Sequence, residues 1–113
     1  MQRKKYDEVQ DIFEIFLDQK RLQHLSPETI TNYKHIFSLY NKVMMVAQLP
    51  VKEFVPEYLT EWHRFLQETE LKKNTIKEYV SKMWSFHMWL YTSKDIALIK
   101  KDLEYLKKEQ NEE

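Results

Sequence analysis

Glycine is absent from all 113 residues of the chain. Average usage near 7% would supply about eight glycines, so turns that need a positive φ are expected to be scarce and β-hairpins built on them are disfavoured. A Gly-rich phosphate loop and a dinucleotide-binding fingerprint are excluded as well, because both need backbone that approaches phosphate closely. The sequence therefore predicts an all-α fold, with helices joined by short polar connections.

The composition describes a chain that folds around one core. Hydrophobic residues make up 42% and well-mixed charged residues 32% of the chain, which suits one globular domain and not a disordered or fibrous protein. There is no cysteine, which rules out disulfides and thiolate metal sites. The longest apolar runs, such as residues 43–47, are far shorter than a membrane span. We therefore expect a cytoplasmic protein with no membrane partner.

Charge is segregated along the chain, although the formal net charge is zero. A zero sum argues against a nucleic-acid binder, in which an excess of positive charge is usual. In segments, however, residues 20–52 carry +4 and residues 71–101 carry +5, whereas residues 1–19, 53–70 and 102–113 carry −2, −4 and −3. Positive charge is therefore concentrated in two separate stretches.

The first two predicted helices have apolar stripes at helical spacing. In residues 4–22 the stripe is Val9, Ile12, Phe13, Phe16 and Leu17. The second helix begins at Ser26, a favoured N-cap, with Pro27 at its first position, and it ends near Leu49 and Pro50. Its inward stripe is Ile30, Tyr33, Phe37, Tyr40 and Met44, and its opposite face carries Thr31, His35, Ser38 and Lys42.

Three further helices are predicted in the rest of the chain. Residues 51–55 form a short connection, and Pro56 opens an acidic third helix. The fourth helix starts within residues 72–74 and runs to about residue 91, and a fifth follows Ser93. The inward stripes are Leu59, Trp62, Phe65 and Leu66 in the third helix, Ile76, Tyr79, Val80, Met83, Phe86 and Leu90 in the fourth, and Ile96, Ile99, Leu103 and Leu106 in the fifth.

The second and fourth helices begin with similar sequences. Residues 25–33 (LSPETITNY) agree with residues 71–79 (LKKNTIKEY) in Leu, Thr, Ile and Tyr, at an offset of 46 residues. This echo indicates two similar helix starts. Chance combined with the shared chemistry of helix starts is the alternative explanation, because these residue types are common there.

Four short stretches occur in a specific order and spacing. They are Phe16-Leu17, then Leu25-Ser26-Pro27-Glu28-Thr29-Ile30-Thr31-Asn32-Tyr33, then Pro56-Glu57-Tyr58-Leu59, and finally Leu71, Asn74-Thr75-Ile76 and the run from Met83 to Leu90. Over about residues 8–92 the chain thereby resembles the N-terminal core-binding (SAM-like) domain of tyrosine recombinases, the phage integrases. The resemblance implies a four- to five-helix bundle whose second and fourth helices lie against duplex DNA. A separate C-terminal domain of these proteins cuts the DNA.

Two features depart from that family. The chain ends before a catalytic domain, so the family's catalytic arginines, lysine, histidine and tyrosine have no counterparts, and none of the seven tyrosines is expected to be a nucleophile. Lys72 stands where the family often has serine, and the acidic residues 102–113 are unlike a usual interdomain linker. We expect residues 1–92 to form the bundle. Residues 93–113 are expected to form an acidic helix or tail, either docked on it or leading to a missing catalytic domain.

The positive charge of the second and fourth helices supplies candidate DNA contacts. A lysine that neutralises a phosphate releases condensed counterions, and a helix start attracts phosphate through its free N–H groups. Each of these residues taken singly is ordinary solvated surface. The net positive charge of the two segments, however, favours DNA contact by the residues as a group. The predicted DNA-binding residues are Thr31, Lys34, His35 and Lys42 in the second helix and Lys72, Lys73, Asn74, Thr75, Lys77, Ser81 and Lys82 in the fourth.

The other chemistry-bearing residues suggest no catalytic site, cofactor or small-molecule substrate. The four histidines show neither an HxxxH nor an HExxH spacing, so no metal site is predicted. Glu57 and Glu61 lie one turn apart on an exposed acidic face, which suits solubility better than acid–base catalysis. The tryptophans are assigned to core packing and not to base stacking. Met88 and Trp89 lie furthest from the inward stripe and are candidates for contact with the fifth helix or a partner.

We therefore expect a DNA-binding domain for site-specific recombination and DNA integration that is not an enzyme by itself. Its expected partners are duplex DNA, a C-terminal catalytic domain and other recombinase subunits. The alternative is a stand-alone regulatory or protein-interaction bundle related to integrases, acting through its acidic third helix and tail. The zero net charge favours this alternative.

Overall fold

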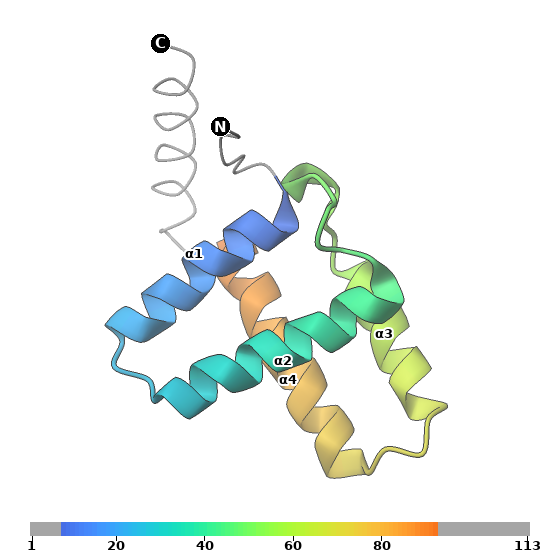
Figure 1. Ribbon diagram of the computed structural model, residues 1–113. Coiled ribbons are helices and arrows are strands. Elements are labelled where there is room, and N and C mark those ends of the chain that lie inside the picture. The colour runs from blue at the N-terminus through green and yellow to red at the C-terminus, as the bar shows by residue number, and fades with distance from the viewer. Residues whose placement is uncertain (1–7, 93–113) are drawn as a thin grey trace.

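Four α-helices and one short 3-10 helix make up residues 8–92, the part of the chain that the computed structural model describes (Figure 1). In chain order they are α1 (Val9–Leu22), α2 (Pro27–Met44), η1 (Val51–Glu53), α3 (Glu57–Gln67) and α4 (Lys73–Thr92). In Figure 1, α2 crosses in front of α4, with α1 and α3 at the two sides. The all-α prediction is confirmed. The predicted fifth helix and residues 4–7 of the predicted first helix lie outside the described residues.

α1 begins at Val9, and its first turn is hydrogen-bonded to the segment that follows α2. Glu8 is extended and forms an isolated antiparallel bridge with Pro50. The backbone N–H groups of Val9 and Gln10 donate to carbonyl oxygens of the segment that precedes Pro50, each at 2.9 Å. These bonds satisfy two of the donors that a helix start leaves free. The start of α1 is therefore fixed by a tertiary contact that its apolar stripe does not reveal.

α2 begins where the sequence predicts and ends earlier. The Ser26 hydroxyl accepts a hydrogen bond from the Thr29 backbone N–H at 3.2 Å, as expected of an N-cap. The helix ends at Met44, because Met45 adopts the left-handed conformation with a φ of 55°. The predicted end near Leu49 was wrong, since helices usually signal such an end with glycine and this chain has none.

The core of the bundle is largely aromatic. The Phe13 and Phe37 rings stack with their centroids 4.1 Å apart, and the Phe86 ring meets Phe13 edge-on at 5.1 Å. Trp62 of α3 is fully buried, with its ring centroid 4.7 Å from that of Tyr40. These contacts join α1, α2, α3 and α4 in one apolar core, whose removal from water is the main stabilising contribution.

The outward faces of the helices are mostly polar but expose some large apolar side chains. Phe65, predicted to be buried, is 43% exposed. It lies about a quarter turn around α3 from the centre of the core-facing side, which Leu59, Trp62 and Leu66 occupy. Within residues 8–92, no helix combines the length and apolarity needed to cross a membrane.

Candidate nucleic-acid interface

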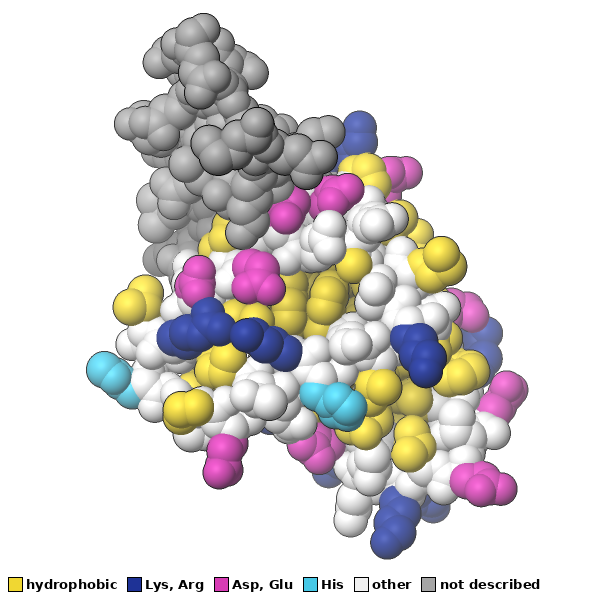
Figure 2. Space-filling model, viewed as in Figure 1, with side chains coloured by type: hydrophobic (Ala, Val, Ile, Leu, Met, Phe, Trp, Pro, Cys, Tyr) yellow, Lys and Arg dark blue, Asp and Glu magenta, His cyan; other side chains and the backbone are white. Residues whose placement is uncertain are grey.

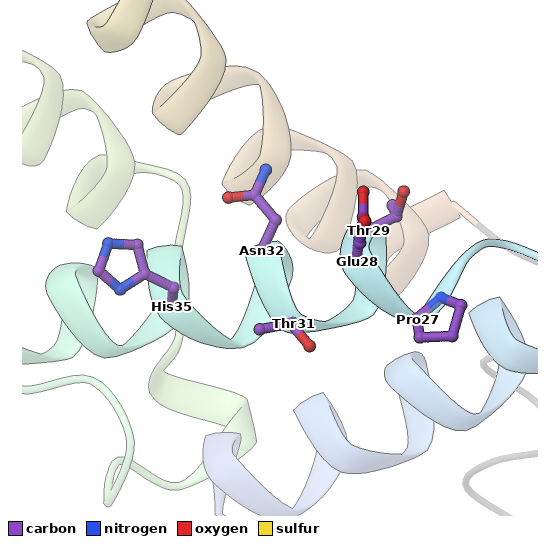
Figure 3. Close-up of a pocket in the computed structure, with 6 residues that line it drawn as sticks. All are labelled: Pro27, Glu28, Thr29, Thr31, Asn32 and His35. Carbon is purple, nitrogen blue, oxygen red and sulfur yellow. The ribbon is translucent and has the colours of Figure 1, made fainter.

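The outward face of α2 is polar and exposed, as predicted. Thr31, His35, Ser38 and Lys42 recur at steps of three and four residues and are all exposed, and so is Lys34. A shallow hollow along the first turns of the helix is drawn in Figure 3, where Asn32 points toward α4. It is lined by Pro27, Glu28, Thr29, Thr31, Asn32 and His35. Hydroxyl, amide and imidazole groups here offer both donors and acceptors, the groups that read base edges.

Two polar contacts join α2 to α4 where the helices cross. Asn32 Nδ2 donates a hydrogen bond to Glu78 Oε1 at 2.8 Å. Lys82 Nζ lies 5.2 Å from the centroid of the Tyr33 ring, a cation–π geometry. Asn32 and Glu78 are 46 residues apart, so they occupy equivalent positions in the two similar helix starts. The two similar helix starts therefore contact each other where α2 and α4 cross.

The predicted DNA-binding residues of α4 divide between two sides of the helix. Lys73, Lys77 and Ser81 follow one another at four-residue steps and share the side toward α3. They line a hollow whose other lining residues are His63, Gln67, Leu71, Ile76, Val80 and Trp84. Lys82 is five residues beyond Lys77 and leaves the helix on the side toward α2. The structure therefore does not bring these lysines together in one patch.

Several of the predicted DNA-binding residues lie close together at the first turn of α4. The Lys72 carbonyl accepts the Ile76 backbone N–H at 3.0 Å, so Lys72 is the N-cap residue just before α4. Lys72, Lys73 and Asn74 are exposed, and Thr75 is half-buried. Free N–H groups and the positive end of the helix dipole add to the two ammonium charges here. This turn has the character of an anion-binding surface.

The lysines of the candidate interface differ from the arginines in their pairing. Arg21 and Arg64 form ion pairs with Asp18 and Glu61, three residues before each of them in the same helix. Among residues 8–92, no ion pair links a carboxylate to Lys34, Lys42, Lys72, Lys73 or Lys77. On the face seen in Figure 2, Lys and Arg side chains form separate groups with uncharged and apolar surface between them. On this face positive charge therefore lies in several separate places and not in one patch.

A buried histidine, which the sequence patterns did not single out, ties α4 to α2 and to the segment after η1. His87 Nε2 lies 3.0 Å from the Tyr40 hydroxyl, and His87 Nδ1 lies 2.8 Å from the Tyr91 hydroxyl. The Tyr91 hydroxyl donates its one hydrogen to the Phe54 carbonyl at 2.9 Å. Nδ1 must therefore carry the proton that it donates to Tyr91, and Nε2 must accept from Tyr40.

This hydrogen-bonded chain is structural. Burial lowers the pKa of His87 to about 4, so the neutral imidazole that the chain requires is the form present near neutral pH. Burial likewise raises the pKa of Tyr91 to about 12, with Glu57 adding to the effect, and raises that of Tyr40 further. One feature of the sequence could have indicated the buried role of His87, which follows Phe86 of the inward stripe and precedes Tyr91 by four residues. Within the described residues, no cluster of three or more His, Cys, Asp or Glu residues could hold a metal ion.

The two C-terminal tryptophans of α4 have different surroundings. Trp89 Nε1 donates to Gln19 Oε1 at 2.8 Å, and its ring packs on Phe16 with centroids 5.3 Å apart. Trp89, singled out as lying off the inward stripe, therefore meets α1. Trp84 is instead the exposed tryptophan, with 48% of its surface accessible.

The chain matches a known protein family. The model of the family described as phage integrase, N-terminal SAM-like domain, matches residues 13–94. The match extends from within α1 to just beyond α4 and so includes the crossing of α2 and α4. No curated protein and no solved structure matches the chain.

Proposed function

Because the chain belongs to the phage integrase N-terminal SAM-like domain family, we propose that it grips duplex DNA for site-specific recombination. The observation that carries this proposal is the crossing of α2 and α4, held by the Asn32–Glu78 hydrogen bond inside the matched region. It presents the polar starts of two helices at one place on the bundle. Phosphate contacts made from both helices then fix the register of the duplex on the domain.

On α2, we assign the hollow to the DNA groove. Thr31, Asn32 and His35 supply hydroxyl, amide and imidazole groups at the crossing, where they can hydrogen-bond to base edges. Lys34 and Lys42 are exposed on the same helix and are assigned to phosphates. Glu78 borders this region, where its carboxylate accepts a hydrogen bond from Asn32.

On α4, we assign the first turns to the sugar–phosphate backbone. Lys72, Lys73 and Lys77 neutralise phosphates, and the exposed side chains of Asn74 and Ser81 donate hydrogen bonds. Thr75 and Lys82 lie on the other side of the helix, toward α2, where they extend the contact across the crossing. Positive charge on both flanks of the crossing suits a duplex that spans it.

We assign the cutting of DNA to a separate catalytic domain of a tyrosine recombinase, which this domain positions in the cytoplasm. The proposed partners are duplex DNA, that catalytic domain and other recombinase subunits. No cofactor enters this role, because it needs only charge and hydrogen bonds arranged on a rigid bundle.

A mixed-sequence duplex tests the proposal, because phosphate contacts do not depend on base sequence. Lys73→Glu is expected to weaken binding about tenfold at low salt and to reduce the slope of log affinity against log salt by about 1. The triple variant Lys72→Glu, Lys73→Glu, Lys77→Glu is expected to abolish binding. The matched control is Lys52→Glu, an exposed lysine on η1. Equal affinities of the Lys73 and Lys52 variants, measured by fluorescence anisotropy, would contradict the assignment.

The second candidate function is a non-catalytic regulatory bundle related to integrases. It is favoured by the acidic outer side of α3, where Glu57, Glu61 and Glu68 are exposed, and by the net charge of zero. Such a bundle would bind a basic protein surface and would fail to bind duplex even at low salt. The titration above therefore distinguishes the two functions.

A further inference from the structure

One tryptophan of α4 is open to solvent in the hollow between α3 and α4, which are neighbours in the bundle (Figure 1). Trp84 has 48% of its surface accessible, whereas Trp62 is fully buried and Trp89 is half-buried. The hollow has a volume of about 730 Å³, within the range of about 300–1,000 Å³ that is usual for small-ligand sites. Core packing therefore does not account for the position of Trp84, and part of its ring is open to a ligand.

Two lysines and a serine lead along α4 toward this tryptophan. Lys73, Lys77 and Ser81 also line the hollow, at four-residue steps on the side of the helix that carries Trp84. Since a helix rises about 1.5 Å per residue, the two lysines are about 6 Å apart along the axis and Trp84 lies about 10 Å beyond Lys77. Among residues 8–92, neither lysine forms an ion pair and no carboxylate lines the hollow. Positive charge at one end of the hollow therefore adjoins an aromatic ring at the other.

The walls of the hollow supply the other groups that a nucleobase needs. Ile76 and Val80 give it an apolar side on α4. His63 and Gln67 are exposed on the α3 side, where the imidazole and the amide offer both hydrogen-bond donors and acceptors. A base has apolar faces and a polar edge, so it can lay one face on Trp84 and turn its edge toward α3.

We propose that this hollow binds single-stranded DNA, with an unpaired base stacked on Trp84 and neighbouring phosphates held by Lys73 and Lys77. Basic side chains that follow the backbone and an aromatic ring that accepts any base are the two parts of a single-strand binding site. A duplex keeps its bases stacked inside, so it offers these lysines its phosphates alone. The site therefore favours a strand that has left the duplex. The choice of DNA over RNA rests on the proposed function.

Binding is tested on the full chain with a short, labelled oligothymidylate, followed by fluorescence anisotropy. Trp84→Ala is expected to weaken binding about tenfold, because stacking of a base on the ring is lost. Trp84→Phe keeps an aromatic ring and should retain most of the affinity. The matched control is Phe65→Ala, which removes an aromatic ring of similar exposure on α3 outside the hollow and should change nothing. Equal affinities of the two alanine variants would overturn the proposal.

Three other ligands separate stacking from charge. An abasic oligomer with the same number of phosphates should bind the wild-type protein only as weakly as oligothymidylate binds Trp84→Ala. Abasic and thymidylate oligomers that bind equally well would overturn the stacking. A glutamate-rich peptide of the same net charge should not displace the oligothymidylate at equal concentration. Displacement would assign the hollow to an acidic protein segment and overturn the proposal. An oligouridylate RNA that binds more tightly than the oligothymidylate would overturn the choice of DNA.

A mixed-sequence duplex, measured in parallel, separates this inference from the proposed function. Trp84→Ala should leave affinity for the duplex unchanged, and an equal loss for both ligands would overturn the inference. Lys77→Gln should weaken both, lowering the slope of log affinity against log salt by about 0.7 for the single strand and about 0.9 for the duplex. Binding of oligothymidylate that depends on Trp84, with no binding of the duplex, would support the inference and overturn the proposed function alone.

Discussion

Asn32 on α2 donates a 2.8 Å hydrogen bond to Glu78 on α4, and these two residues occupy the same position in two similar helix starts. The bond therefore lies where the two halves of the bundle face each other. It also lies beside the hollow of Thr31 and His35. This polar contact thus adjoins the surface that we assign to DNA, where α2 and α4 cross.

The bond between Asn32 and Glu78 predicts the effect of a charge change at the crossing. Asn32→Asp places two carboxylates together and is expected to lower the free energy of unfolding by about 1 kcal/mol, because the pair is partly exposed. Adding Glu78→Gln restores a donor opposite the new carboxylate and should recover most of the loss. Urea unfolding of the two single variants and the double variant measures the coupling. A double variant no more stable than Asn32→Asp would show that the bond contributes nothing.

Phe16 is predicted to be a main contributor to the core. It is fully buried, and its ring centroid lies 5.2 to 5.4 Å from those of Phe86, Trp89 and Tyr33. Phe16→Ala is expected to cost about 3–5 kcal/mol, a large part of the 5–15 kcal/mol that stabilises a typical domain. Phe65→Ala is the control and should cost less than about 1 kcal/mol, since Phe65 is exposed. Similar losses in thermal or urea unfolding would contradict this packing.

Stability is predicted to fall in mild acid because of His87. Its pKa is lowered to about 4 in the folded protein, below its ordinary value of 6.5, so the unfolded chain takes up the proton first. The contribution of neutral His87 to the free energy of unfolding is complete above the ordinary pKa of 6.5 and is lost as the pH falls toward 4. Between about pH 7 and about pH 5.5 the free energy of unfolding should drop by about 1 kcal/mol from this residue.

The control for this pH dependence is His87→Gln. It removes the titrating group and leaves a side chain that can still donate and accept hydrogen bonds. The variant should be less stable at neutral pH and should lose most of the decline between about pH 7 and about pH 5.5. Urea unfolding at several pH values measures both effects. If the free energy of unfolding of the variant declines by the same amount, the decline belongs to groups other than His87.

Much of the helical architecture could be predicted, because it depends on local signals. Ser26 and Pro27 mark the start of α2 through cap chemistry, and the apolar stripes identify the buried sides of α1, α2 and α4. The end of α2 could not be predicted, since the left-handed residue there is Met45 and not glycine, and Val46 and Ala47 after it are buried by contacts that are distant in sequence. The buried role of His87 depends on Tyr40 and Phe54, which are distant in sequence.

The candidate site was harder to predict than the fold. Periodicity correctly identified Thr31, His35 and Lys42 as one exposed face, because they lie on a single helix. Segment charge, however, cannot tell on which side of α4 each lysine lies, and the structure separates Lys77 from Lys82. Asn32 was passed over as a site residue, since its contact with Glu78 exists only once the two helices cross.

The central claim is that duplex DNA docks where α2 and α4 cross. Titration of a mixed-sequence duplex into ¹⁵N-labelled protein, followed by amide NMR at two salt concentrations, tests it most directly. We expect saturable shifts at Thr31, Asn32 and His35 and in the first turns of α4, with an affinity that falls steeply as salt rises. Shifts confined to α1 and α3, or no shifts at low salt, would contradict the account.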